Sequence, residues 1–249
     1  KEEFHETLRY FRVALADAEV DVQLNRRVTA VDLVGFDDVV LATGVTPRIP
    51  DVKGIDHPKV VTYLDVLRDH VSVGSTVAVM GAGGIGFDVA EYLTQSGPSA
   101  TVTPDRFYAE WGIDTSYSNR GGLTQVQLER PPRKITLLQR KHSKVGGGLG
   151  KTTGWIHRTE LKKRGVDMVP GVTYKSIDDA GLHMTIDDQP VVLDVETIVV
   201  CTGQEPQREL LADLEAAPAT VHVIGGADVA AELDAKRAIK QGTEVAAAL

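Results

Sequence analysis

The chain has 249 residues, enough for one large domain or two ordinary ones, and its hydrophobic fraction of 42% and charged fraction of 25% are typical of globular proteins. A net charge of -8 argues against a nucleic-acid partner, and no apolar run approaches the ~20 residues of a membrane-spanning helix. The single cysteine, Cys201, allows no internal disulfide, so we expect a cytoplasmic protein whose partners include neither nucleic acid nor membrane.

The first seventy residues show helical, strand and turn patterns in succession. Residues 2–18 repeat apolar side chains at helical spacing and predict an amphipathic helix, whereas residues 20–24 alternate apolar and polar side chains and predict a strand. Residues 38–42 form an apolar run that ends in Thr43-Gly44, which is typical of a buried strand that meets a loop. A connector rich in proline follows, and residues 65–69 predict a short helix.

The centre of the chain has the order strand, glycine loop, helix. Residues 76–80 are rich in β-forming side chains, the loop Gly81-Ala82-Gly83-Gly84-Ile85-Gly86 follows at once, and residues 87–95 predict a helix. Residues 97–133 are rich in Gly, Pro, Ser and Thr and predict a long loop. Loops of this length in a compact domain are usually functional or specific to one family.

The remaining residues predict two helices and several short strands. The helices cover 155–163 and 230–249, and the strand candidates are 135–139, 166–169, 175–178, 182–186, 191–193, 197–201 and 221–224. Strands and helices that alternate around a glycine loop indicate an α/β fold with a Rossmann-like parallel sheet and covering helices.

The glycine loop has the residue pattern of a dinucleotide-binding turn. Gly81 permits a tight turn after the strand, Gly83 lets the backbone approach a pyrophosphate, and Gly86 allows the following helix to pack closely on the strand. The helix N-terminus then offers free N–H groups to the anion. The alternative is an ordinary glycine-rich turn, which the joint occurrence of strand, loop and helix disfavours.

The end of the second strand of such a unit decides between NAD and NADP. An acidic residue there binds the ribose 2′-hydroxyl of NAD, whereas a basic residue accommodates the 2′-phosphate of NADP. If the second strand is 135–139, its end carries Arg140 and Lys141 with no acid nearby, which favours NADP. The alternative is a solvated basic face, because Lys144 and Lys151 follow.

Three further junctions between a strand and a glycine could face a nucleotide. Thr43-Gly44 and Thr202-Gly203 both end apolar runs. Because they occur as a pair that flanks a glycine-loop domain, they indicate strand ends that lie against a bound nucleotide. A strand at 221–224 runs into Gly225-Gly226-Ala227-Asp228. Asp228 either caps a helix or hydrogen-bonds the ribityl chain of a flavin.

No metal site and no catalytic residue is predicted. The histidines are scattered without ligand spacing, and one cysteine cannot supply a zinc cluster. Cys201 ends an apolar run and is expected to be a buried small hydrophobe rather than a redox thiol.

Several strings of this sequence resemble bacterial NADPH-dependent 2,4-dienoyl-CoA reductases. The most specific is Lys151-Thr152-Thr153-Gly154-Trp155-Ile156-His157-Arg158. The others are 54–60, 63–67, 81–88, 110–114 and 203–206, so the resemblance runs from Phe4 to the C-terminus. The family has an N-terminal (β/α)8 barrel with FMN, a cysteine-bound iron–sulfur cluster and a two-dinucleotide flavoprotein region. The chain lacks the cysteine cluster and the first FAD glycine loop, so it resembles only the C-terminal portion.

The resemblance implies a domain organisation and a set of cofactor-binding residues. Residues 1–50 and 203–249 would be two pieces of a partial FAD-binding domain, and the NADPH-binding domain at 51–202 would be inserted between them. Gly226, Asp228 and the helix residues Ala235, Arg237 and Ala238 match the second FAD segment. Arg140 and Lys141 match the 2′-phosphate corner, and Arg158 is a further candidate.

The implied function is electron entry. NADPH would bind and pass hydride to FAD within a 2,4-dienoyl-CoA reductase of unsaturated fatty acid β-oxidation, with the remainder of the parent polypeptide as partner. We expect NADP(H) binding, doubtful FAD retention and no full activity from this chain alone. Two alternatives stay open: another oxidoreductase of the trimethylamine dehydrogenase or NADH oxidase type, which Arg140-Lys141 disfavours, or a dinucleotide-binding fragment without catalysis.

Overall fold

The computed structural model describes residues 2–214, 218–231 and 235–249, and the chain divides into two compact units. The smaller unit comprises Lys1–Val28 and Gln95–Arg130, and the larger unit comprises Thr29–Thr94 and Pro131–Leu249. Among the described residues, no helix has both the length and the apolar character needed to cross a membrane.

The smaller unit is helical. It contains η1 (Glu2–Phe4), α1 (His5–Asp17), η3 (Ala100–Val102), α4 (Pro104–Trp111) and η4 (Arg120–Gly122). The helix predicted over 2–18 is confirmed, but none of its described residues is buried. The strand predicted over 20–24 is wrong, because in the described chain those residues pair with no other strand, and an alternating pattern alone supplies no hydrogen-bonding partner.

The predicted loop 97–133 contains the helix α4, which the sequence analysis missed. Pro104 occupies its first turn, where the missing N–H costs nothing. Gly112 ends the helix in a left-handed conformation with φ of 64°. A Cβ atom at Gly112 would lie 2.5 Å from the carbonyl oxygen of Thr124, so this turn requires glycine.

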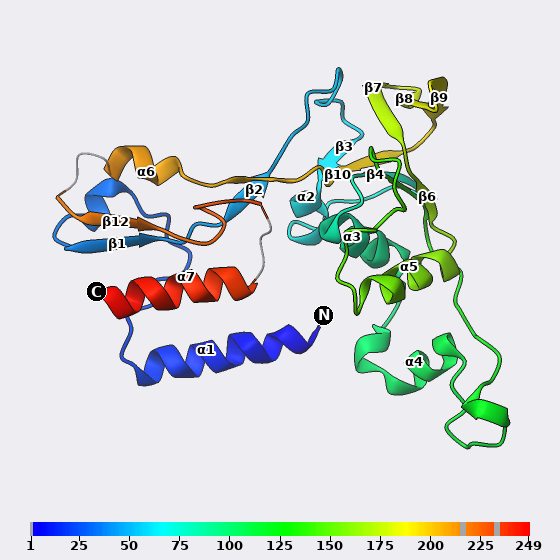
Figure 1. Cartoon of the computed structure of the whole chain (residues 1–249), viewed down its shortest axis with the longest axis horizontal. Helices are drawn as coiled ribbons and strands as arrows, with labels where there is room; N and C mark the ends of the chain where they lie inside the picture. Colours follow the sequence, from blue (N-terminus) through cyan, green and yellow to red (C-terminus); the bar gives the residue numbers. More distant parts are fainter. Residues whose placement is uncertain (1, 215–217, 232–234) are drawn as a thin grey trace. The chain divides into compact units, whose positions relative to one another are not determined.

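The larger unit contains a five-stranded parallel sheet in the order β3-β10-β4-β5-β6 (Figure 1). Every pair of neighbours is parallel, as expected for a Rossmann-like sheet. The strands are β3 (Val60–Thr62), β10 (Thr197–Val200), β4 (Thr76–Met80), β5 (Lys134–Leu138) and β6 (Asp167–Val169). The accompanying helices are α2 (Tyr63–Leu67), α3 (Gly84–Thr94) and α5 (Gly154–Lys163).

Both faces of this sheet are covered. Val77 and Val79 of β4 pack with α2, α3 and α5 on one face, whereas Ala78 and Met80 pack with a three-stranded antiparallel sheet on the other. These four side chains are fully buried, which explains why residues 77–80 of β4 form a continuous apolar run. The antiparallel layer is β7 (Val172–Asp178), β8 (Gly181–Ile186) and β9 (Gln189–Leu193).

A second parallel pair, β1 (Asp38–Leu41) with β12 (Thr220–Val223), has its own small core. The elements η2 (Ala30–Leu33), α6 (Glu209–Leu214) and α7 (Ala235–Ala248) accompany it. The predicted helix 230–249 is confirmed over Ala235–Ala248. Its predicted start is wrong, because residues 230 and 231 are not helical, and residues 232–234 lie outside the described chain.

Two short strands join the two parallel sheets of the larger unit. They are β2 (Val45–Pro47) and β11 (Gln204–Pro206), which pair antiparallel. Each follows one of the two Thr-Gly junctions, so Thr43-Gly44 and Thr202-Gly203 lie at opposite ends of the same two-stranded ribbon.

Candidate functional site

The glycine loop connects β4 to α3 in a conformation that only glycine allows at two positions. Gly81 has φ of 111°, and a Cβ atom there would lie 2.3 Å from the carbonyl oxygen of Cys201. A Cβ atom at Gly86 would lie 1.9 Å from the carbonyl oxygen of Gly81. Gly83 and Gly84 face open space, because a Cβ atom on either would have no heavy atom of the described residues within 4 Å. The loop therefore has one crowded side and one open side.

A cavity of about 610 Å³ lies on the open side of the loop. It brings together the loop residues Gly81 to Ile85, the basic pair Arg140-Lys141 and the junction Thr202-Gly203, which are far apart in the sequence. Sequence reasoning missed the other lining residues, which are Gln139, Ser143, Gly147, Gly148, Leu149, Tyr174, Cys201, Gln204 and Ala230. Most of these are loop residues with no local signal.

Arg140 and Lys141 are exposed and follow β5 directly, in a turn that Gln139 organises. The Gln139 amide donates to the carbonyl oxygens of Lys141 at 2.9 Å and Ser143 at 2.7 Å. The Gly146 N–H donates to the Gln139 side-chain oxygen at 3.3 Å. These contacts fix the conformation of the basic turn, which lines the same cavity as the glycine loop.

Arg158 lies in α5 and does not line the cavity. Its guanidinium donates to the carbonyl oxygen of Gly146 at 2.8 Å. Gly146 has φ of 68°, and a Cβ atom there would lie 2.5 Å from the Phe87 ring. In this arrangement Arg158 holds the glycine-rich segment 146–148, and its predicted contact with a 2′-phosphate stays a prediction.

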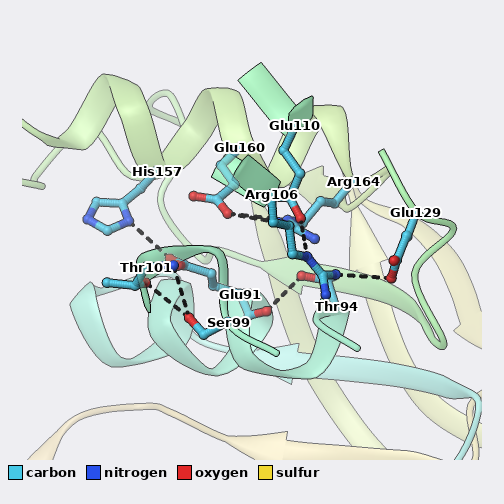
Figure 2. A network of polar contacts seen from close by, with 10 residues as sticks. All are labelled: Glu91, Thr94, Ser99, Thr101, Arg106, Glu110, Glu129, His157, Glu160 and Arg164. Atoms are coloured by element: carbon cyan, nitrogen blue, oxygen red, sulfur yellow. Dashed lines mark hydrogen bonds and ion pairs between the residues drawn. The ribbon is translucent and has the colours of Figure 1, made fainter. Parts of the chain in front are cut away.

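A polar side-chain contact links α3 to α5 on the helical face of the larger unit (Figure 2). The Nδ1 atom of His157 lies 3.3 Å from a carboxylate oxygen of Glu91. Sequence reasoning assigned His157 no role, and the structure shows that it bridges α3 and α5. In the smaller unit, the Arg106 guanidinium contacts Glu110 at 2.9 Å and Glu129 at 3.0 Å (Figure 2).

Thr43 and Gly44 lie against the glycine turn after β12. A Cβ atom at Gly226 would lie 2.7 Å from a Val45 methyl group and 3.1 Å from the Gly44 carbonyl carbon. The Thr43 hydroxyl donates to the carbonyl oxygen of Gln207 at 2.6 Å. Two segments predicted to bind flavin are thus in direct contact, although they do not line the glycine-loop cavity.

Asp228 is bonded to α7 but does not begin it. Its carboxylate accepts from the Gln241 amide at 2.8 Å, and the Gln241 oxygen accepts from the Gly225 N–H at 2.8 Å. Because α7 begins at Ala235, Asp228 is not its N-cap, which removes the simpler of the two interpretations made from the sequence. The predicted residues Ala235, Arg237 and Ala238 form the first turn of α7, where the Ala238 methyl group would lie 3.7 Å from a Cβ atom at Gly225.

Cys201 is buried, as the sequence predicted, and its carbonyl group lies beside Gly81 of the glycine loop. Burial raises the pKa of its thiol to about 12, so the sulfur is protonated at neutral pH. Among the residues that the structure describes, no group of three His, Cys, Asp or Glu side chains could hold a metal ion.

The chain is similar to a known oxidoreductase family and to several larger reductases. The family model described as pyridine nucleotide-disulphide oxidoreductase matches residues 5–238. The chain is 26% identical over 236 residues to the metal reductase of Desulforamulus reducens, covering 91% of this chain and 34% of that protein. It is 32% identical over 104 residues to the cinnamate reductase of Clostridium sporogenes, covering 41% of this chain and 15% of that protein.

Among solved structures, the chain resembles 2-naphthoyl-CoA reductase in complex with 2-naphthoyl-CoA. The TM-score is 0.75 at 21% identity, and the match covers 96% of this chain and 31% of that one. The chain therefore spans about a third or less of the length of these proteins. This structural likeness supports the α/β fold with Rossmann-like dinucleotide-binding domains.

Proposed function

Because this chain belongs to the pyridine nucleotide-disulphide oxidoreductase family, we propose that it is the region of a larger flavoprotein reductase that binds NADPH and delivers its hydride to FAD. Binding of pyridine nucleotide and FAD is typical of the family. The observation that carries the proposal is the cavity that joins the glycine loop, the Arg140-Lys141 turn and Thr202-Gly203.

The residues of the cavity fit a dinucleotide. Gly83 and Gly84 leave a cradle that a Cβ atom would partly fill, so backbone N–H groups can approach a diphosphate. The N-terminus of α3, an 11-residue helix, adds the positive end of its dipole. Arg140 offers a fork of donors matched to a phosphate, and Lys141 adds a compact charge. These two side chains favour NADPH over NADH.

The segments around Thr43-Gly44 and Gly226 fit a flavin-binding role. Their backbones touch, as expected of glycines that let strand ends approach a ligand. Asp228 and the first turn of α7, with Arg237, would hold the polar part of FAD, which accepts hydride when bound. We therefore propose FAD-binding pieces at 1–50 and 203–249 and an NADPH-binding domain at 51–202. The ribbon of β2 and β11 near both boundaries supports this division.

We also propose that the parent protein is a 2,4-dienoyl-CoA reductase with an FMN barrel and an iron–sulfur segment. The string at 151–158 supports this assignment, and a similar solved structure is named for a CoA thioester. The two curated relatives described above are named for metal and cinnamate reduction, so the substrate needs a direct test. NADPH oxidation by the full-length parent with 2,4-dienoyl-CoA, cinnamate and ferric citrate as separate acceptors would decide between them.

The nucleotide site itself is tested with Gly83→Ala. The new methyl group meets no atom of the described residues but enters the cradle, so we expect unchanged thermal stability. The NADPH affinity should fall by about tenfold or more, which corresponds to ~1.4 kcal/mol. Gly150→Ala is the matched control, because Gly150 does not line the cavity and its built Cβ has only an ordinary contact at 3.5 Å. Calorimetric titration of the wild type and both variants measures the affinities. Equal NADPH affinity in all three proteins would contradict the proposed site.

A further inference from the structure

Tyr174 of β7 lies between two cavities of the larger unit. One is the glycine-loop cavity, and the other, of about 590 Å³, is lined among others by Arg48, Val52 and Glu205. Tyr174, Arg140 and Thr202 line both. The pairing of β7 with β8 is irregular between Tyr174 and Ser176, and bulges of this kind redirect side chains next to functional sites.

The hydroxyl of Tyr174 is buried and has no hydrogen-bond partner among the described residues. Burial raises the pKa of this hydroxyl, and the Arg140 guanidinium partly opposes that rise. The Gly81 backbone is near enough to lower the pKa as well, yet no group of the described chain meets the geometry of a hydrogen bond to this oxygen. The group is therefore a protonated donor whose hydrogen bond is unused.

An unused buried donor calls for an explanation, because most buried polar groups are paired. Its neighbours Gly81 and Arg140 belong to the two parts of the cavity that we assign to the diphosphate and the 2′-phosphate. In a dinucleotide these two groups are joined by the adenosine ribose. Because the hydroxyl has no hydrogen-bond partner among the described residues, a bond to a ligand would displace none of them.

We infer that Tyr174 is a further nucleotide-binding residue, whose hydroxyl donates a hydrogen bond to the adenosine ribose–diphosphate part of the bound dinucleotide. This inference rests on the proposed dinucleotide site. NADPH and NADH share the part that this hydroxyl would contact. Tyr174 therefore raises the affinity for both nucleotides and does not discriminate between them. Arg140 and Lys141 keep that second role.

The test is Tyr174→Phe, titrated with NADPH, NADH and 2′-phospho-ADP-ribose. Affinity for all three should fall by the same factor of roughly three to ten, as expected for one neutral hydrogen bond. Removal of an unpaired buried hydroxyl should leave the melting temperature of the ligand-free protein unchanged or raise it. Tyr92→Phe is the control, because Tyr92 is exposed on α3 and does not line the cavity, so neither quantity should change.

The outcomes separate this inference from the proposed function. If the wild type binds no NADPH, the proposed function fails. If the wild type binds and Tyr174→Phe binds equally well, only the Tyr174 assignment fails. A loss confined to NADPH and NADH, with 2′-phospho-ADP-ribose unaffected, would move the contact to the nicotinamide ring and overturn the inference. A lowered melting temperature in the ligand-free variant would show that the hydroxyl is structural and would overturn it as well.

Discussion

Gly86 packs against the backbone of Gly81, since a Cβ atom at residue 86 would lie 1.9 Å from the Gly81 carbonyl oxygen. The first turn of α3 therefore packs against the end of β4 at a distance that no side chain permits. Gly83 lies between these two glycines in the sequence, and a Cβ atom at Gly83 would have no atom of the described residues within 4 Å. One loop thus contains glycines with a packing role and a glycine with room for a ligand.

Gly86→Ala should destabilise the fold. The added methyl group meets a backbone oxygen that cannot rotate away, so we expect a loss of about 1–3 kcal/mol in the free energy of unfolding, as for other overpacked sites. Urea denaturation measures this loss against the wild type, with Gly83→Ala as the control within the same loop. Equal unfolding midpoints for Gly86→Ala and Gly83→Ala would contradict the packing role of Gly86.

Replacement of both Arg140 and Lys141 by alanine should weaken the binding of NADPH far more than the binding of NADH. The two nucleotides differ only by the 2′-phosphate, whose charge needs donors at the end of β5. Two charge-assisted contacts contribute a few kcal/mol in total before screening by salt. A loss of roughly ten- to a hundredfold is therefore expected for NADPH.

Dissociation constants for both nucleotides at one fixed salt concentration test that choice. The control is Lys144→Ala, because Lys144 is an exposed cation of the same segment that does not line the cavity. If the affinities of the double variant for NADPH and NADH fell by the same factor, Arg140 and Lys141 would form a general anion patch and not a 2′-phosphate site.

The 249-residue chain by itself should bind NADP(H) and hold FAD poorly. Its sequence contains one GxGxxG loop, at 81–86, and the described β1–β12 sheet has only two strands. We also expect no reduction of 2,4-dienoyl-CoA, because no catalytic residue for that step is predicted here. Absorbance at the flavin wavelength after gel filtration with added FAD is the measurement. Stoichiometric flavin in the eluted protein would refute the expectation.

Cys201 should be unreactive in the native protein near neutral pH. Burial raises the pKa of its thiol from 9.0 to about 12, so the nucleophilic thiolate is absent at pH 8. A folded pKa above the unfolded value means that the folded state holds its proton more tightly. The contribution of this thiol to the free energy of unfolding is therefore complete below pH 9 and is lost as the pH rises toward 12. Labelling with an aromatic disulfide reagent should be slow in native protein and stoichiometric in guanidinium, and rapid native labelling at pH 8 would count against this environment.

Much of the α/β unit could be predicted from local patterns. The apolar run of β4, the glycine loop and the helix after it depend on neighbouring residues, and the structure has them in the predicted order. The strand predicted at 20–24 failed because alternation of side chains does not supply a partner strand. The helix α4 was missed because its signals, Pro104 and Gly112, lie in a segment whose composition resembles a loop.

The sequence by itself determined the elements of the site, because a turn that needs positive φ, a helix start and a basic strand end are specified within a few residues. Only the tertiary structure decided which of them meet. The order β3-β10-β4-β5-β6 brings Thr202 of one strand end and Arg140 of another to opposite sides of the glycine loop. The antiparallel layer that covers the other face of the sheet brings Tyr174 to the same cavity. Such contacts join residues tens of positions apart, and burial of both sheet faces, not local spacing, selects them.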